Sequence, residues 1–114
     1  MEEPNHVYNA RVVRIVDGDT VDFDVDLGFN IHARIRGRLI GVDTPERGHE
    51  DWYKATQTCA ELLRSVAKID GTFPYDETLI VKIKTYKTGK YGRWLVEING
   101  VTDKLAEIWP YNED

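Results

Sequence analysis

The feature that most constrains the fold is a strict alternation of apolar and acidic residues between Thr20 and Leu27. Valine, phenylalanine and leucine occupy positions 21, 23, 25 and 27, whereas aspartate occupies positions 22, 24 and 26. Successive side chains of a β-strand point to opposite faces. The segment is therefore predicted to be a strand with one buried face and one solvated face.

Strands are also expected on both sides of this segment. Residues 7–16 are rich in β-branched side chains, and residues 17–19 (Asp-Gly-Asp) are typical of a turn. A tight Gly-Phe-Asn connection leads into a third strand over 30–42, so a hairpin is predicted there. The apolar parity of the third strand switches near Gly37 or Gly41, which predicts a bulge or bend.

The pattern then changes to helices around two further strands. A long amphipathic helix is expected over 50–68 and a short helix over 102–109. Between them, two strands over 78–85 and 93–98 are joined by a polar loop over 86–92. Cys59 falls on the apolar side of the long helix and is expected in the core. Thr102 is expected to be the N-cap of the short helix.

This order of elements matches one known architecture. Three strands, a helix, two strands and a short helix fit the five-stranded OB-type barrel. The predicted fold class is therefore mainly β with helices (α+β), with one long and one short helix packed on the barrel. Because 114 residues fit one domain, we expect a single domain over 1–114 with its core at about 7–109.

Bulk composition narrows the classes of protein further. A single cysteine excludes an internal disulfide, and no apolar run approaches the roughly 18 residues of a membrane span. The net charge of −5 argues mildly against a generic nucleic-acid binder, but not against a nuclease with local positive charge. The acidic, polar start is not a secretory signal. We expect an intracellular monomer without membrane association, unless a leader has been removed.

Two short acidic turns carry the candidate site, namely Asp-Gly-Asp-Thr at 17–20 and Asp-Thr-Pro-Glu at 43–46. Asp19 and Asp43 lie at predicted strand ends, where loops can bring them together as oxygen ligands for calcium or magnesium. Glu46 is a candidate general base for a water beside a phosphate. Each turn alone is also an ordinary turn sequence, since aspartate bonds its own backbone in turns.

Arginines near these turns suggest a phosphate site. Arg38 precedes the second turn, and Arg93 stands at the head of the last predicted strand. Two such guanidinium groups would stabilise charge that builds on phosphate oxygens during attack. Arg34 and Arg36 are more simply interpreted as surface groups that neutralise the aspartates across the hairpin.

Three motifs taken together are specific. They are Val-Asp-Gly-Asp-Thr-Val at 16–21, Arg-Leu-Ile-Gly-Val-Asp-Thr-Pro-Glu at 38–46, and Lys-Tyr-Gly-Arg at 90–93. In this order they resemble the staphylococcal nuclease (thermonuclease-like) family, and the resemblance covers roughly residues 7–109. It implies a calcium-dependent nuclease that hydrolyses DNA and/or RNA to leave 5′-hydroxyl and 3′-phosphate ends.

The resemblance also implies a role for each matching residue. Asp19, Asp43 and the backbone carbonyl of Thr44 are implied as calcium ligands. The remaining implied roles are a base or water-positioning group (Glu46), phosphate-binding arginines in the transition state (Arg38 and Arg93) and contacts to the nucleotide phosphate (Lys90 and Tyr91).

Two departures from the family modify these expectations. The typical C-terminal segment, with its last helix and further nucleotide-contacting tyrosines, has no counterpart in this sequence, so weaker substrate binding and stability are expected. The acidic composition contrasts with the basic, secreted members of the family. Two other interpretations remain, a non-catalytic OB-fold module that binds nucleic acid or protein, and a structural interpretation in which acidic and basic strands only neutralise each other.

Overall fold

The computed structural model describes residues 6–70, 78–88 and 94–111. Within them the chain forms, in order, β1 (His6–Asp17), β2 (Thr20–Asp26), β3 (His32–Leu39), α1 (Trp52–Val66), β4 (Lys68–Asp70), β5 (Thr78–Thr88), β6 (Trp94–Glu97) and α2 (Thr102–Ile108). Neither helix of this described part is long and apolar enough to cross a membrane.

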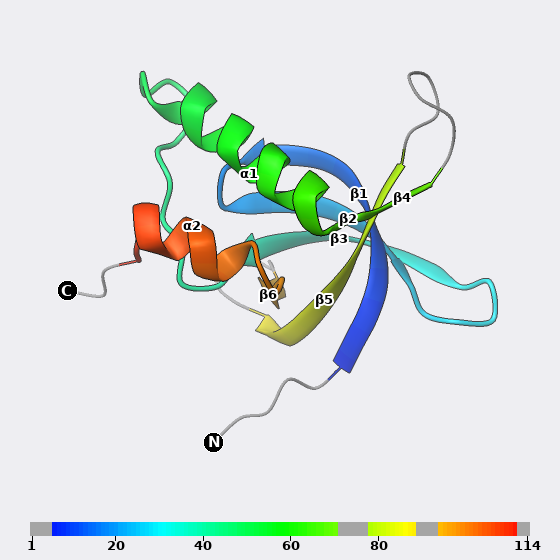
Figure 1. Cartoon of the computed structure of the whole chain (residues 1–114). Coiled ribbons are helices and arrows are strands. Elements are labelled where there is room, and N and C mark those ends of the chain that lie inside the picture. Colours follow the sequence, from blue (N-terminus) through cyan, green and yellow to red (C-terminus); the bar gives the residue numbers. More distant parts are fainter. Residues whose placement is uncertain (1–5, 71–77, 89–93, 112–114) are drawn as a thin grey trace.

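Five of the strands close into a barrel (Figure 1). The order is β1-β2-β3-β6-β5, and β5 returns to pair with β1. The β3–β6 pair is parallel and the other pairs of the barrel are antiparallel. The short β4 adds to β5 outside the closed ring. The fold is therefore a mixed five-stranded barrel of the OB type with two helices, as the element order predicted.

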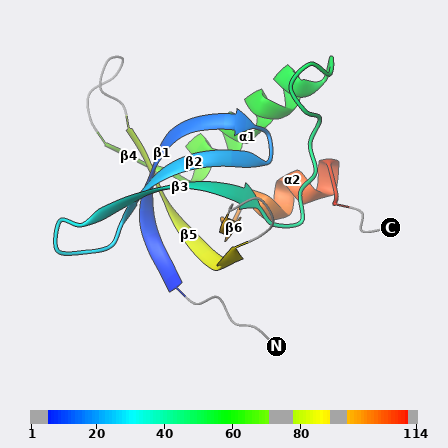
Figure 2. The same ribbon diagram turned by 180° about the vertical axis from the view of Figure 1, so that it is seen from behind.

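The alternating segment forms β2, and its apolar face lies inside the barrel. Val21, Phe23 and Val25 are buried, as the alternation predicted. Leu27 differs because β2 ends at Asp26, so Leu27 belongs to the turn and is 44% exposed. The β2–β3 connection projects away from the two helices, which is clearest from behind (Figure 2).

The third strand is shorter than the sequence predicted. β3 ends at Leu39, whereas the prediction ran to Val42. Gly41 adopts a φ of +77°, a conformation that glycine reaches without steric cost, and turns the chain there. Val42 then forms an isolated antiparallel bridge with Pro110. The parity switch therefore marks the end of the strand and the start of a new contact with the C-terminal part of the chain.

Other helix and strand ends also differ from the prediction, and one strand was not predicted. The long helix spans Trp52–Val66 because the chain leaves it to form β4, which was not predicted. Three residues are too few to show a period of two, and β4 is recognised by its pairing with β5. β5, which was predicted over 78–85, extends to Thr88.

The start of α2 corrects a predicted helix cap. Val101 occupies the N-cap position, and no side-chain hydrogen bond caps the helix. Thr102 is the first helical residue instead, and its hydroxyl donates to the carbonyl oxygen of Ile98 at 3.0 Å. Asp103 Oδ1 accepts from the backbone N–H of Gly100 at 2.8 Å, which ties the preceding turn to the helix.

One face of α1 covers part of the barrel core. Ala55, Cys59 and Leu63, spaced at three to four residues, are the buried residues of this helix. The helix packs against β1 and β5. Cys59 lies in the core, as predicted, and its thiol is free. Burial, together with the negative charge of Asp19, raises the pKa of Cys59 to about 12.

We predict that the Cys59 thiol is unreactive in the native protein. Only the thiolate attacks a disulfide reagent, and a buried thiol with a raised pKa forms almost none at mildly alkaline pH. A thiol-exchange assay should give no fast reaction in buffer and one equivalent of reaction in denaturing guanidinium. The Cys59→Ser variant is the blank for both conditions, and rapid native reaction would contradict the buried placement of this helix face.

Candidate functional site

The candidate site lies where the β1–β2 turn meets the segment that follows β3. The register of β2 and β3 places Thr20 opposite Arg38. The backbone N–H of Leu39 donates to the carbonyl oxygen of Asp19 at 2.7 Å. Sheet pairing alone therefore brings Asp19, the residue before β2, beside the last residues of β3.

The carboxylate of Asp19 is buried and receives donors from three segments. Its Oδ2 lies 2.7 Å from Nη1 of Arg38 and accepts from the backbone N–H of Thr44 at 3.1 Å. Its Oδ1 accepts from the hydroxyl of Thr20 at 2.9 Å. Asp19 is only 6% exposed, so these partners offset the cost of removing its charge from water.

The second acidic turn approaches the same guanidinium group. Nη2 of Arg38 lies 3.9 Å from Oδ1 of Asp43 and donates to the carbonyl oxygen of Val42 at 3.0 Å. The Asp43 side chain is 58% exposed, in contrast to that of Asp19. Both predicted ligand aspartates therefore meet Arg38, one buried and tightly paired, the other open to solvent.

The C-terminal part of the chain holds the second turn in place. The backbone N–H of Asp43 donates to the carbonyl oxygen of Trp109 at 2.9 Å, and that of Tyr111 donates to the carbonyl oxygen of Gly41 at 3.1 Å. The Tyr111 ring also lies 5.7 Å from Cζ of Arg38, within reach of a cation–π interaction. Sequence reasoning missed Tyr111, because no local pattern links it to Arg38.

The first turn is anchored to α1. Asp17 Oδ1 accepts from the indole N–H of Trp52 at 2.7 Å, and the Arg47 guanidinium lies 4.8 Å from the ring of that tryptophan. Gly18 fits closely between Thr44 and Ala55. The first aspartate of the Asp-Gly-Asp turn thus has a structural partner, which the sequence did not reveal.

Glu46 is exposed, three residues beyond Asp43, and its backbone carbonyl accepts from the N–H of His49 at 3.0 Å. Lys90, Tyr91 and Arg93 lie outside the described residues, so their predicted roles stay predictions.

The donor set near Asp19 suits a hard divalent cation. A carboxylate offers about four lone-pair directions. Oδ2 of Asp19 meets two donors and Oδ1 meets one, which leaves an acceptor direction on Oδ1. Asp43 and the Thr44 carbonyl would add oxygen ligands, the type that calcium and magnesium prefer.

Two further observations qualify this fit. Among the described residues, no group of three or more His, Cys, Asp or Glu side chains could hold a metal ion. An ion here would therefore need water or substrate oxygens as well, as magnesium and calcium often do. In the same part of the chain, the buried hydroxyls of Thr44 and Thr56 make no hydrogen bond. A buried hydroxyl without a partner is uncommon and compatible with an ion-bound water next to Thr44.

The outer face of the barrel carries ion pairs that belong to the fold. Arg36 donates to Oδ1 and Oδ2 of Asp22 at 2.8 and 3.2 Å, and Arg14 lies 3.6 Å from Oδ2. The hydrogen bond from Arg36 lowers the pKa of Asp22, and the positive charges of Arg36 and Arg14 lower it further, whereas burial opposes the shift. Arg36 therefore neutralises an aspartate across the hairpin, as predicted.

We predict a pH-dependent effect of Arg36→Ala on stability. Near pH 7 the free energy of unfolding should fall by less than ~1 kcal/mol, because the pair is partly solvated. Asp22 has a lowered pKa when folded, so its stabilisation is complete above the unfolded value of about 3.9 and is lost as pH falls through the folded value. Urea unfolding should therefore show a difference that shrinks on acidification.

The matched control is Lys82→Ala. Lys82 is exposed on β5 and forms no ion pair with the described residues. It should change stability by less than ~0.5 kcal/mol at either pH. An Arg36→Ala effect that persists or grows in acid would contradict the assignment to Asp22.

Gly18→Ala should be destabilising by about 1–3 kcal/mol, because the site turn has no room for a methyl group. A Cβ at Gly18 would lie 2.9 Å from Cγ2 of Thr44 and 3.0 Å from both Cβ and the carbonyl oxygen of Ala55. Urea unfolding measures the loss, with Asn9→Ala at an exposed position of β1 as the control. A stability equal to wild type would show that the turn is looser than described.

Comparisons with known proteins leave the family of this chain open. No protein-family model matches the chain, and no match to it is found among curated proteins. Its function is therefore inferred from the sequence motifs and from the convergence of the two acidic turns on Arg38.

Proposed function

We propose that this protein is a calcium-dependent nuclease that hydrolyses phosphodiester bonds of DNA and/or RNA, leaving 5′-hydroxyl and 3′-phosphate ends. The observation that carries the proposal is the meeting of Asp19 and Asp43, from two distant turns, at one guanidinium group. Carboxylates and an arginine in contact combine a cation site with a phosphate site. Ion pairing alone would explain Arg38 and Asp19, but not the open carboxylate of Asp43 beside them.

Asp19, Asp43 and the carbonyl of Thr44 would hold the cation. When bound, a divalent cation there polarises a phosphodiester oxygen and orients an attacking water. Asp19 is fixed by three donors, so its Oδ1 is presented in one position and loses little entropy on binding. Asp43 is solvated, which leaves a path for ion and substrate to enter.

Arg38 would bind the phosphate. A guanidinium group has five N–H donors. In the described part of the chain, Arg38 directs Nη1 at Asp19 and Nη2 at Val42, so donors remain for phosphate oxygens. Its side chain is 20% exposed, and partial burial strengthens its interaction with charge that develops during attack.

Glu46 would remove a proton from the attacking water. The side chain is exposed and follows Asp43 by three residues. A general base must be within hydrogen-bond reach of that water, directly or through one further water. Arg93 would share the phosphate charge, and Lys90 and Tyr91 would contact the nucleotide.

A cleavage assay tests the proposal. Wild-type protein should degrade single-stranded DNA or RNA with calcium and stop with a chelator. Glu46→Gln should lower kcat by about 10²–10⁴-fold as expected for loss of a general base. Arg38→Lys should lower it by about 10²–10³-fold, because lysine lacks the planar fork. Products should accept phosphate at their 5′ ends without prior treatment.

Arg36→Lys is the matched control. It changes the same residue type, two positions along β3, in a side chain bonded to Asp22 on the barrel surface. Its kcat should equal that of wild type. Absence of calcium-dependent turnover, or full activity in Glu46→Gln, would overturn the proposal. Tight oligonucleotide binding without cleavage would favour the non-catalytic binding module.

A further inference from the structure

Trp52, the first residue of α1, contacts both acidic turns of the candidate site. Its indole N–H donates to Oδ1 of Asp17 at 2.7 Å, and its ring lies 4.8 Å from Cζ of Arg47. Asp17 opens the first turn, two residues before Asp19, and Arg47 directly follows Glu46. These two contacts, named here the Trp52 link, join the segment of the proposed metal ligand to the segment of the proposed base.

The aromatic ring, and not a carboxylate, is the partner of the Arg47 guanidinium. Glu46, Glu50 and Asp51 are close to Arg47 in sequence. Within residues 6–70, 78–88 and 94–111, however, no ion pair involves Arg47. A cation over a ring is attracted by the ring quadrupole, and tryptophan is the best partner for it. The direction of this exposed side chain is therefore set by Trp52.

Backbone hydrogen bonds close the loop that runs from Glu46 to Trp52. The N–H of His49 donates to the carbonyl oxygen of Glu46 at 3.0 Å, and the N–H of Trp52 donates to that of His49 at 3.0 Å. Nδ1 of His49 accepts from the N–H of Asp51, also at 3.0 Å. The backbone beside Glu46 is thus tied to the start of α1 by two routes, one through His49 and one through Arg47.

The contact with Asp17 places this loop relative to the first turn. Gly18, between Asp17 and Asp19, has no room for a methyl group, so the turn has little freedom to move. In the part of the chain that the structure describes, no partner orients the exposed carboxylate of Glu46. A general base must stay within hydrogen-bond reach of its water, and a misplacement of about 1 Å can lower a rate by about 10²-fold. The backbone must therefore supply the position of Glu46.

We propose that Trp52 is a positioning residue, which holds the Glu46 loop against the first acidic turn through Asp17 and Arg47. The inference rests on the proposed nuclease function, because that function gives Glu46 its role. Loss of the indole should lower kcat and leave KM and calcium affinity unchanged. Asp19 keeps its three donors without Trp52, so the proposed cation site stays assembled.

The test compares Trp52→Leu, Arg47→Ala and the double variant on single-stranded DNA with calcium. Trp52→Leu should lower kcat by about 10²-fold, with KM unchanged and with wild-type calcium affinity by calorimetry in the absence of DNA. Arg47→Ala should also lower kcat, and the double variant should lose no more than Trp52→Leu, because both substitutions break one link. Arg47 is exposed, so its variant still tests the proposal if Trp52→Leu does not fold.

Trypsin cleavage after Arg47 tests the link without ion or substrate. A protease cuts a closed loop only after local opening. Cleavage after Arg47, identified by the mass of the fragment 1–47, should be about tenfold faster in Trp52→Leu than in wild type. The matched control is Tyr53→Leu, which changes the neighbouring aromatic residue of α1, 67% exposed. It should behave as wild type in both assays.

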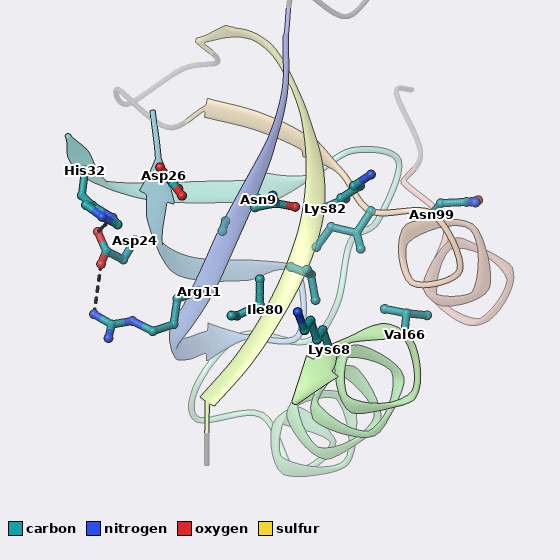
Figure 3. A pocket seen from close by; sticks show the side chains of 13 residues that line it. Asn9, Arg11, Asp24, Asp26, His32, Val66, Lys68, Ile80, Lys82 and Asn99 are labelled. Carbon is teal, nitrogen blue, oxygen red and sulfur yellow. Dashed lines mark hydrogen bonds and ion pairs between the residues drawn. The ribbon is translucent and has the colours of Figure 1, made fainter. Parts of the chain in front are cut away.

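Arg11→Ala is the matched control for Arg47→Ala. Arg11 lines an open cavity over β1, β2 and β5, where it pairs with Asp24 at 3.0 Å (Figure 3). Its kcat should equal that of wild type. Wild-type kcat in Trp52→Leu, a change confined to KM or calcium affinity, or additive losses in the double variant would overturn the inference.

The two assays also separate the link from the nuclease function. A wild-type protein that never cleaves nucleic acid, but whose Trp52→Leu variant is cut faster by trypsin, would refute the nuclease and leave the Trp52 link standing. Equal trypsin rates in wild type and Trp52→Leu would refute the link, whether or not the protein is a nuclease.

Discussion

The arrangement of the site depends on the buried carboxylate of Asp19. Its three donors come from the start of β2, from β3 and from the segment after β3. A buried charge is strongly destabilising when one of its partners is lost. The three segments must therefore assemble together, and the group that locks them is also the proposed metal ligand. The proposed metal binding and the assembly of the three segments both require the carboxylate of Asp19 at this position.

Much of this could be predicted from sequence where the pattern is local. The alternation in β2 fixed which residues face the core, and the register of the hairpin then set Asp19 beside Arg38. What escaped prediction depends on contacts between distant segments. The hydrogen bond between Trp52 and Asp17 and the contact between the Tyr111 ring and Arg38 produce no periodic pattern in the sequence. The end of β3 is set partly by the bridge between Val42 and Pro110.

The β2–β3 hairpin separates two kinds of surface. At one end, charged groups surround the proposed cation site, and at the other the exposed ring of Phe29 faces solvent. Between them, Asp22 and Asp24 of β2 are paired with arginines of β1 and β3, so much of the charge of these two residues is cancelled locally. A net charge of −5 therefore says little about the field along this path.

The contacts of the second turn also set an order of events during synthesis. Asp43 and Gly41 take their backbone partners from Trp109 and Tyr111. Chains emerge from the ribosome N-terminus first, and contacts distant in sequence close last. The β1–β3 meander can form while translation continues, and Asp19 and Arg38 can then bind Thr44 and Val42. The backbone hydrogen bonds with Trp109 and Tyr111 are added only after residues 109–111 have emerged. The conformation of the segment that carries Asp43 is therefore completed late in synthesis, after the first three strands of the barrel have formed.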